Sequence, residues 1–157
     1  MFHEFNAKEI LEMARQIEKN GATFYQNAAE DVADSKVKDV LSELAEMELK
    51  HEQIFAEMIE NLSPGDSQEV VLDPFEETAA YIQALTDTRV FYEKKVDTSS
   101  AKEILKAAII AEKESILFYV GMKEIVAEET GKAKVGDIIR EEMGHIQLIH
   151  QRLKELG

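Results

Sequence analysis

The feature that most constrains this chain is an internal repeat, in which residues 7–54 match residues 101–148 at a constant offset of 94 positions. The two segments share 17 identities in 48 ungapped pairs, where about 3 are expected by chance for ordinary compositions. The identities include aromatic and histidine positions, so a shared richness in Glu and Ala does not explain them. A repeat of this length indicates two copies of one supersecondary unit.

Each copy opens with a helix start signal. Asn6 is followed three residues later by Glu9, and Ser100 is followed by Glu103, so both copies carry a capping box at the same offset. With breaks at 34–35 and 63–66, this predicts three helices over about 7–33, 36–62 and 101–128. A fourth follows a turn marked by Gly131 and continues to about residue 156.

A long connection separates the two predicted helix pairs. Within it, Asp73-Pro74 is a cap followed by Pro at the first helical position, which predicts a shorter helix over about 74–85 and a further turn near 90–94. Adjacent antiparallel helices need only about 2–8 connecting residues, so this segment suits a crossover. The chain has 7 Gly and 2 Pro, and so few chain breakers favour long helices.

The expected fold is therefore all-α. We predict a single domain over residues 1–157, a four-helix bundle made of two repeated helix pairs with a long, partly helical crossover. The helix pairs span about 7–62 and 101–156, and the crossover spans about 63–100.

One face of each predicted long helix is apolar except near its middle. Steps of three and four residues trace these faces, and each carries a glutamate, followed one turn later by a histidine in the second helix of each pair. The residues are Glu18, Glu48, His51, Glu112, Glu142 and His145. Unpaired core carboxylates cost several kcal/mol or more, and none of these faces is basic. Protonated carboxyl groups would reduce that cost, but two divalent cations are the simpler solution because they balance four carboxylates.

Two further glutamates combined with two Glu-x-x-His pairs form the pattern of di-iron and dimanganese bundle sites. Residues three apart share a helix face, so a Glu and its His can reach the same metal pair. We expect Glu18 and Glu112 to be terminal ligands and Glu48 and Glu142 to bridge the two metals. A lone Glu-x-x-His is a weak signal, but two at the repeat offset are specific.

Tyr25 and Tyr119 lie seven residues after the first ligand of each repeat, on the same helix face. Two interpretations stay open: their hydroxyls orient ligand carboxylates, or they are core aromatics with a hydrogen-bonded hydroxyl. Four other glutamates lie off the apolar faces, and we expect them to be solvated, as we do two further histidines. They are Glu46, Glu52, Glu114 and Glu141, and His3 and His150.

Charge and composition exclude several classes of function. A net charge of −14 argues against a nucleic-acid partner, because phosphate binding needs a basic surface. No stretch approaches the roughly 20 apolar residues of a membrane span. The chain has no Cys, which excludes disulfides, cysteine zinc sites and iron–sulfur centres. Its first residues lack the basic and apolar regions of a signal peptide, so we expect a cytoplasmic location.

The tandem order Glu…Glu-x-x-His…Glu…Glu-x-x-His resembles the ferritin-like di-iron superfamily, and within it the chain looks like a rubrerythrin. The resemblance covers almost the whole chain. It implies two iron ions per chain held by the six residues, with manganese or a mixed pair as alternatives. It also implies a homo-oligomer, with a dimer favoured.

Two departures from that family affect the expected chemistry. Rubrerythrins proper carry a rubredoxin-like domain with four Cys, which this chain lacks. Its electrons must therefore come from an external partner such as a rubredoxin, or it behaves as an erythrin-type protein. Ser115 stands where rubrerythrins carry an extra carboxylate. In that family, the redox-linked exchange of a metal between a carboxylate and a histidine involves this position.

The resemblance implies a non-haem di-iron oxidoreductase that reduces hydrogen peroxide with an external electron donor. Two adjacent Fe²⁺ ions can deliver the two electrons that one peroxide needs. The alternatives are a ferroxidase or iron-storage protein that reacts with dioxygen or peroxide, a dimanganese catalase-like enzyme, and an interaction module with a vestigial site.

Overall fold

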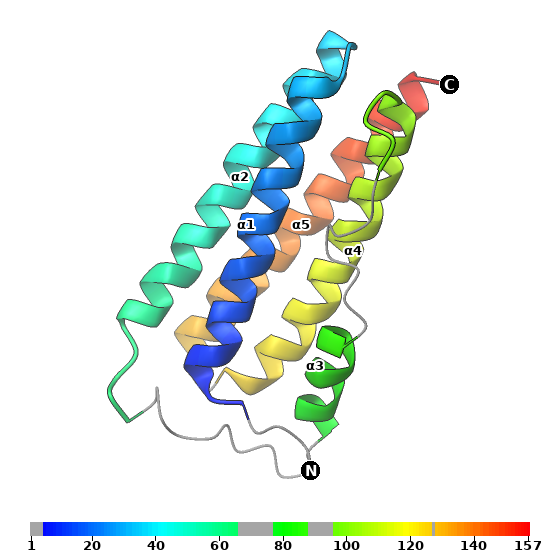
Figure 1. The fold of residues 1–157 in the computed structure, drawn as a ribbon. Helices are drawn as coiled ribbons and strands as arrows, with labels where there is room; N and C mark the ends of the chain where they lie inside the picture. The colour runs from blue at the N-terminus through cyan, green and yellow to red at the C-terminus, as the bar shows by residue number, and fades with distance from the viewer. Residues whose placement is uncertain (1–4, 66–76, 88–95, 127) are drawn as a thin grey trace.

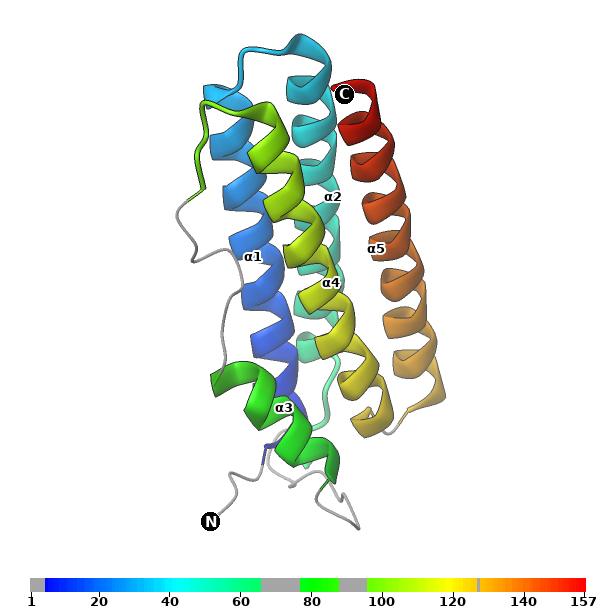
Figure 2. The same ribbon diagram turned by 90° about the vertical axis from the view of Figure 1, so that its right-hand side faces the viewer.

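The computed structural model describes residues 5–65, 77–87, 96–126 and 128–157. Within these ranges the chain is all-helical. The helices are α1 (Ala7–Asp31), α2 (Ser35–Glu60), α3 (Glu77–Asp87), α4 (Ala101–Ile125) and α5 (Glu129–Glu155). The four long helices lie side by side as a bundle, with the short α3 at one end (Figure 1, Figure 2). The predicted all-α four-helix bundle is therefore confirmed.

Three of the long helices begin at side-chain caps, and the capping-box pattern predicts two of these caps. Asn6 Oδ1 accepts a 2.9 Å hydrogen bond from the Glu9 amide, and Glu9 Oε2 accepts one of 3.0 Å from the Asn6 amide, which completes the capping box of α1. Asp34 accepts from two amides in the first turn of α2. Ser100 Oγ accepts from the Glu103 amide at the start of α4. These bonds satisfy donors that the first helical turn leaves free.

The predicted boundary between the last two long helices is wrong, because α4 ends at Ile125 and not near residue 128. Gly131 lies inside the first turn of α5, which begins at Glu129, and not in a turn before it. A Cβ at Gly131 would lie 2.6 Å from Cγ1 of Val126, so the glycine allows the end of one helix to approach the start of the next. A glycine selected for close packing has the same appearance in sequence as one that ends a helix.

The crossover agrees with its prediction where it is described. The helix expected over about 74–85 corresponds to α3, while residues 74–76 and the turn expected near 90–94 lie outside the described residues. α2 ends at one end of the bundle and α4 begins at the other (Figure 1), so the two helices are joined across opposite ends, as expected of a crossover.

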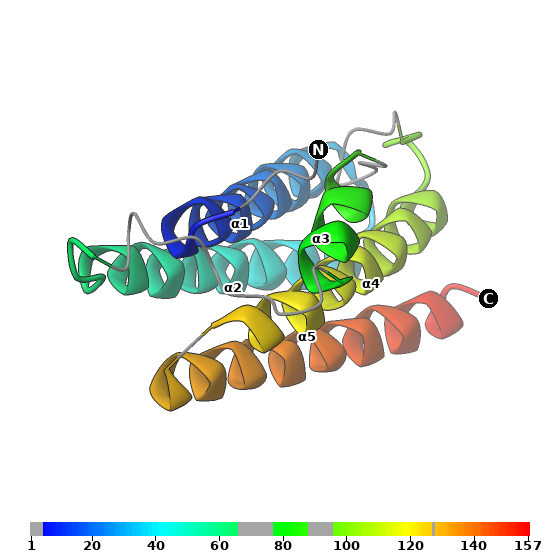
Figure 3. The same ribbon diagram turned by 90° about the horizontal axis from the view of Figure 1, so that it is seen from below.

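α3 docks on α4 near one end of the bundle (Figure 3). The Tyr81 hydroxyl donates a 2.7 Å hydrogen bond to the Leu117 carbonyl, and Ile82 is fully buried. A Cβ at Gly121 would lie 2.7 Å from the Tyr81 ring, so the glycine lets that ring lie against α4. The crossover is thus anchored to the outside of the bundle.

The bundle is built from two helix pairs, since α1 contacts chiefly α2 and α4 contacts chiefly α5. Its core forms two apolar clusters. One contains Leu11, Phe55 and Ile138, and the other contains Leu41 and Leu105, among others. The middle turns of the four long helices lie between these clusters, and this is where the predicted ligands fall. None of the described helices is long and apolar enough to cross a membrane.

Candidate metal centre

The structure brings all six predicted ligands together at the middle of the bundle. Each is at most 2% exposed, although every one is polar or charged. α1 and α4 each contribute one glutamate, and α2 and α5 each contribute a glutamate and the histidine one turn later. The residues are Glu18, Glu48, His51, Glu112, Glu142 and His145.

The six side chains form two overlapping groups whose potential ligand atoms lie within 4.8 Å of one another. We call the first the His51 subsite; it contains Glu18, Glu48, His51 and Glu142. We call the second the His145 subsite; it contains Glu48, Glu112, Glu142 and His145. Glu48 and Glu142 belong to both groups, which is the arrangement expected of carboxylates that bridge two metals.

Both histidines turn Nδ1 toward the carboxylates. His51 Nδ1 lies 3.0 Å from Glu142 Oε1 and 3.5 Å from Glu18 Oε2. His145 Nδ1 lies 2.9 Å from Glu142 Oε2 and 3.3 Å from Glu48 Oε1. The two imidazole rings are stacked, with centroids 5.7 Å apart and planes inclined by 18°. Each subsite therefore combines three carboxylates with one imidazole nitrogen.

Burial raises the pKa of three of the four carboxyl groups, and the negative charge of Glu142 raises it further in each case. The three are Glu18, Glu48 and Glu112. Burial also acts to raise the pKa of Glu142, but hydrogen bonds with Glu112 and the two histidines outweigh it and hold that pKa below its usual range. Glu142 is thus the carboxylate that stays ionised most readily.

The carboxylates raise the pKa of both histidines, although burial alone would lower it. Burial by itself lowers the pKa of His51, but hydrogen bonds with Glu142 and Glu18 outweigh it and raise the pKa to about 11. The same balance raises the pKa of His145 to about 12, with Glu112 as its strongest partner. Without a metal, two imidazolium ions therefore offset part of the buried negative charge at neutral pH.

The donor atoms fit a pair of divalent cations. Four carboxylate oxygens at the centre make no well-aligned hydrogen bond within the described part of the chain, and Nδ1 of His145 makes only ion-pair contacts with the carboxylates around it. The oxygens are Glu18 Oε2, Glu48 Oε1, Glu112 Oε2 and Glu142 Oε2. Buried acceptors without partners are costly, and carboxylate and imidazole donors suit iron or manganese. A metal at each subsite would give these atoms partners.

The two tyrosines contact the terminal carboxylates of the opposite repeat. The Tyr25 hydroxyl donates to Glu112 Oε1 at 2.5 Å, and the Tyr119 hydroxyl donates to Glu18 Oε1. Both rings are fully buried. Of the two interpretations of these tyrosines, the structure therefore shows the contact that the orienting role requires.

Sequence reasoning missed Glu141, which was expected to be solvated. Its side chain is half exposed, but Oε2 lies 2.8 Å from Nε2 of His51. Its one detectable signal was its place immediately before a predicted ligand, Glu142. On the other side of the ring, His51 Nδ1 faces the carboxylates, so this histidine is held at both nitrogens.

The other glutamates outside the apolar faces differ in their surroundings. Glu46 is exposed, as expected. Glu52 is instead largely buried and accepts a 2.5 Å hydrogen bond from Arg15 Nε, and Glu114 has a buried Oε2 whose burial raises its pKa. The expectation of solvation is therefore wrong for both, and for Glu52 the cause is Arg15 of α1, which lies against its carboxylate.

Ser115 and His150 do not take part in the cluster of six side chains. His150 is exposed, as expected, and His3 lies outside the described residues. Ser115 is buried, and its hydroxyl donates to the Ala111 carbonyl one turn earlier in the same helix. The serine hydroxyl is thus engaged by its own helix and is not directed at a ligand.

A four-helix bundle that buries two Glu-x-x-His pairs and two further glutamates at its centre belongs to the ferritin-like class of proteins. A family model for rubrerythrin matches residues 9–154, so the chain belongs to the rubrerythrin family. A crystal structure from Thermotoga maritima, described as a ferritin-like diiron-carboxylate protein, is similar with a TM-score of 0.73. It is 24% identical, and the match covers 100% of both chains. No curated protein sequence matches significantly.

Proposed function

We propose that this protein is a non-haem di-iron oxidoreductase that reduces hydrogen peroxide with electrons from an external donor. The observation that carries the proposal is the pair of overlapping subsites that share Glu48 and Glu142. Membership of the rubrerythrin family supports it, as does the similarity to a protein described as a diiron-carboxylate protein.

In this proposal the six buried residues hold the two metals. Glu48 and Glu142 would be shared by both metals, Glu18 and His51 would complete the first subsite, and Glu112 and His145 would complete the second. When bound, a pair of Fe²⁺ ions supplies the two electrons that convert one peroxide and two protons to two water molecules. The four carboxylates balance the charge of the two ions.

The surrounding residues set the conditions for this chemistry. Tyr25 and Tyr119 hold the terminal carboxylates through their hydroxyls and so limit how far those carboxylates can rotate. The apolar clusters on either side of the centre keep bulk water away from it, which strengthens electrostatic interactions inside. The two histidines must release the proton at Nδ1 before that nitrogen can bind a metal.

The test is single-turnover peroxide reduction by anaerobically prepared protein loaded with Fe²⁺. We expect consumption of about one peroxide per metal pair and then a stop, because two electrons reduce one peroxide. A rubredoxin with its reductase should restore turnover. Continued peroxide loss with release of oxygen in the absence of reductant would show a catalase-like site instead. Retention of many irons per chain after oxidation would show storage.

The oligomeric state and the electron donor are part of the same proposal. A homodimer should sediment at about twice the chain mass of 17.8 kDa, and a single species at the chain mass would contradict it. Because the chain has no Cys, it holds no rubredoxin-type iron to relay electrons. In this proposal the donor is a separate protein that docks on the bundle.

A further inference from the structure

The two subsites are related by the internal repeat, and most of their parts correspond at the offset of 94 residues. Each has three carboxylates and one imidazole. The terminal carboxylate of each accepts a hydrogen bond from a tyrosine of the other repeat. Any chemical difference between the two subsites must therefore come from positions at which the repeat is broken.

The repeat is broken at the outer nitrogen of the two histidines. Nε2 of His51 lies 2.8 Å from Glu141 Oε2. Nε2 of His145 is buried and has no hydrogen-bond partner among the residues that the structure describes. The outer nitrogen of His51 thus has a carboxylate partner, whereas the outer nitrogen of His145 has none among the described residues.

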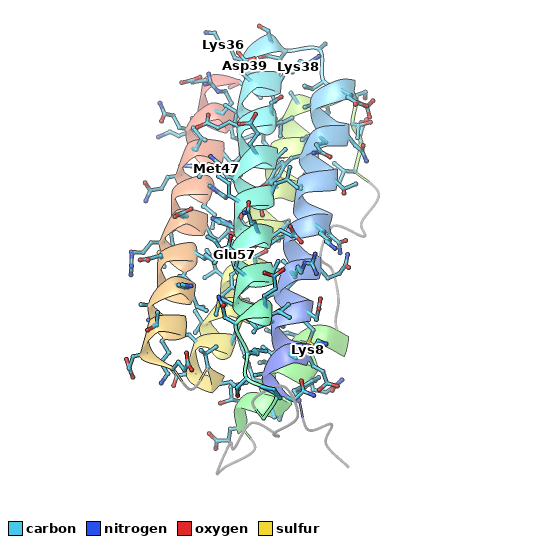
Figure 4. All side chains as sticks on the ribbon, turned by 90° about the vertical axis from the view of Figure 1, so that its left-hand side faces the viewer. Lys8, Lys36, Lys38, Asp39, Met47 and Glu57 are labelled. Carbon is cyan, nitrogen blue, oxygen red and sulfur yellow. The ribbon has the colours of Figure 1, made fainter. Side chains whose placement is uncertain are left out.

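The sequence explains this difference. The position that corresponds to Glu141 in the first repeat is Met47, immediately before Glu48 as Glu141 is immediately before Glu142. Met47 lies on α2, half-buried (Figure 4). A thioether is at best a weak hydrogen-bond acceptor, so Met47 cannot replace the carboxylate that the repeat would require.

A carboxylate at the outer nitrogen changes how a histidine binds a metal. It accepts the outer N–H, which fixes the tautomer that leaves Nδ1 free for the metal, and it holds the ring in place and makes the imidazole more basic. Loss of such a partner commonly costs about 10–100-fold in metal affinity. Because both subsites share Glu48 and Glu142 and have the same number of carboxylates, charge alone does not distinguish them.

We infer that the two metal positions are unequal, and that the His51 subsite binds a divalent cation more tightly and fills first because Glu141 supports its histidine. This inference rests on the proposed two-metal centre. Glu141 is a positioning residue, since it acts through His51 and not on the metal itself. The inference concerns the order and affinity of metal loading, independently of any reaction.

The first test is the location of a substoichiometric metal. Crystals of metal-free protein supplied with one equivalent of Mn²⁺ per chain should show the stronger anomalous peak between Glu18 and His51. Equal peaks, or a stronger one beside His145, would overturn the inference but leave a two-metal centre in place. No peak at either position, even with excess Mn²⁺, would overturn the metal centre and the inference together.

The second test is calorimetric titration of metal-free variants with Mn²⁺. Glu141→Leu should weaken the tighter binding step about 10–100-fold and leave the weaker step unchanged. The matched control is Asp137→Asn, which removes one negative charge from an exposed residue one turn earlier on α5 and should change neither step. An unchanged tighter step in Glu141→Leu, or equal weakening of both steps, would contradict the inference.

The reciprocal variant is Met47→Glu, which places a carboxylate at the position equivalent to Glu141. It should tighten the weaker step without affecting the tighter one, provided that circular dichroism and thermal melting show that the variant folds. If it folds and the weaker step stays unchanged, the missing carboxylate is not what separates the two subsites. The result with Glu141→Leu tests the inference even if Met47→Glu fails to fold.

Discussion

The hydroxyl of Tyr25 on α1 donates a 2.5 Å hydrogen bond to Oε1 of Glu112 on α4, 87 residues further along the chain. The equivalent tyrosine of the second repeat, Tyr119, donates to Glu18 on α1. Each repeat therefore supplies the donor that holds the terminal carboxylate of the other. The two halves of the centre cannot be assembled separately, because each depends on a side chain from the opposite helix pair.

Tyr25→Phe should weaken both the fold and the centre. It removes a donor from a buried carboxylate, which typically costs about 1–3 kcal/mol of unfolding free energy, and it frees Glu112 to rotate. Urea denaturation of metal-free protein and calorimetric Mn²⁺ titration measure the two effects. The control is Tyr81→Phe, which removes the hydroxyl that bonds the Leu117 carbonyl outside the centre and should leave metal affinity unchanged. Equal metal affinity in Tyr25→Phe and wild type would contradict an orienting role.

Replacement of either shared glutamate should abolish binding of the metal pair, with opposite effects on metal-free stability. Glu48→Gln mimics the protonated state that burial favours for Glu48, so the metal-free protein should become more stable. Glu142→Gln removes the carboxylate that both histidines contact, so the metal-free protein should become less stable. Metal analysis and thermal melting give the two readouts.

Exposed Glu46 provides the control for both substitutions, since Glu46→Gln lies outside the cluster and should change neither metal content nor melting temperature. Two metals per chain in both Glu48→Gln and Glu142→Gln would exclude the assignment of these residues as shared ligands.

Metal binding should stabilise the protein. A ligand that binds only the folded state contributes about 2.7 kcal/mol at 100 times its Kd, and here it also relieves repulsion among the buried carboxylates. Thermal melting with saturating Mn²⁺ should give a clearly higher midpoint than melting with a chelator. The gap should narrow in mild acid, because protonated ligands bind metal more weakly. Identical midpoints at neutral pH would argue against a buried metal site.

The stability of metal-free protein should fall as the pH rises above about 6.5, the ordinary pKa of histidine. In the folded state the pKa is about 11 for His51 and about 12 for His145, so the folded state keeps protons that the unfolded state releases. Their contribution is complete below pH 6.5 and is lost as the pH rises through the folded values. The raised pKa of Glu48 acts in the same direction from about pH 4.5 upward.

Urea denaturation of chelator-treated protein at pH 6, 7.5 and 9 measures this dependence. Substitution of both buried histidines by Gln should flatten the slope, whereas substitution of exposed His150 should not. If metal-free wild-type protein were equally stable at all three pH values, the two histidines would not carry charge in the folded state.

The elements of the fold could be predicted from the sequence because their causes are local. Asn6 and Asp34 cap the helices that follow them, and both bonds are formed in the structure. Hydrophobic steps of three and four residues identify the buried face of a helix. Polar residues on such a face, such as Glu48 and His51, must then lie in the core. The internal repeat further predicts that the two helix pairs contribute equivalent residues to the core.

Other relationships were decided only by the tertiary structure. The sequence placed Tyr25 on the same face as Glu18, but the hydroxyl bonds Glu112 on another helix. It placed Glu141 outside the apolar face, but the half-exposed carboxylate reaches Nε2 of His51 across the boundary between α2 and α5. Gly131 resembles a helix end in the sequence, but in the structure it lies within α5 and allows close approach to Val126.

The physical reason is the same in each case. The 3.6-residue period of a helix fixes the direction of a side chain around its own axis, and this can be deduced from local spacing. Which atom of a neighbouring helix that side chain meets depends on the distance, the crossing angle and the relative height of two helices. Those quantities result from packing of the whole core. The sequence by itself therefore determined which residues form the centre, and the tertiary structure decided how each of them is held.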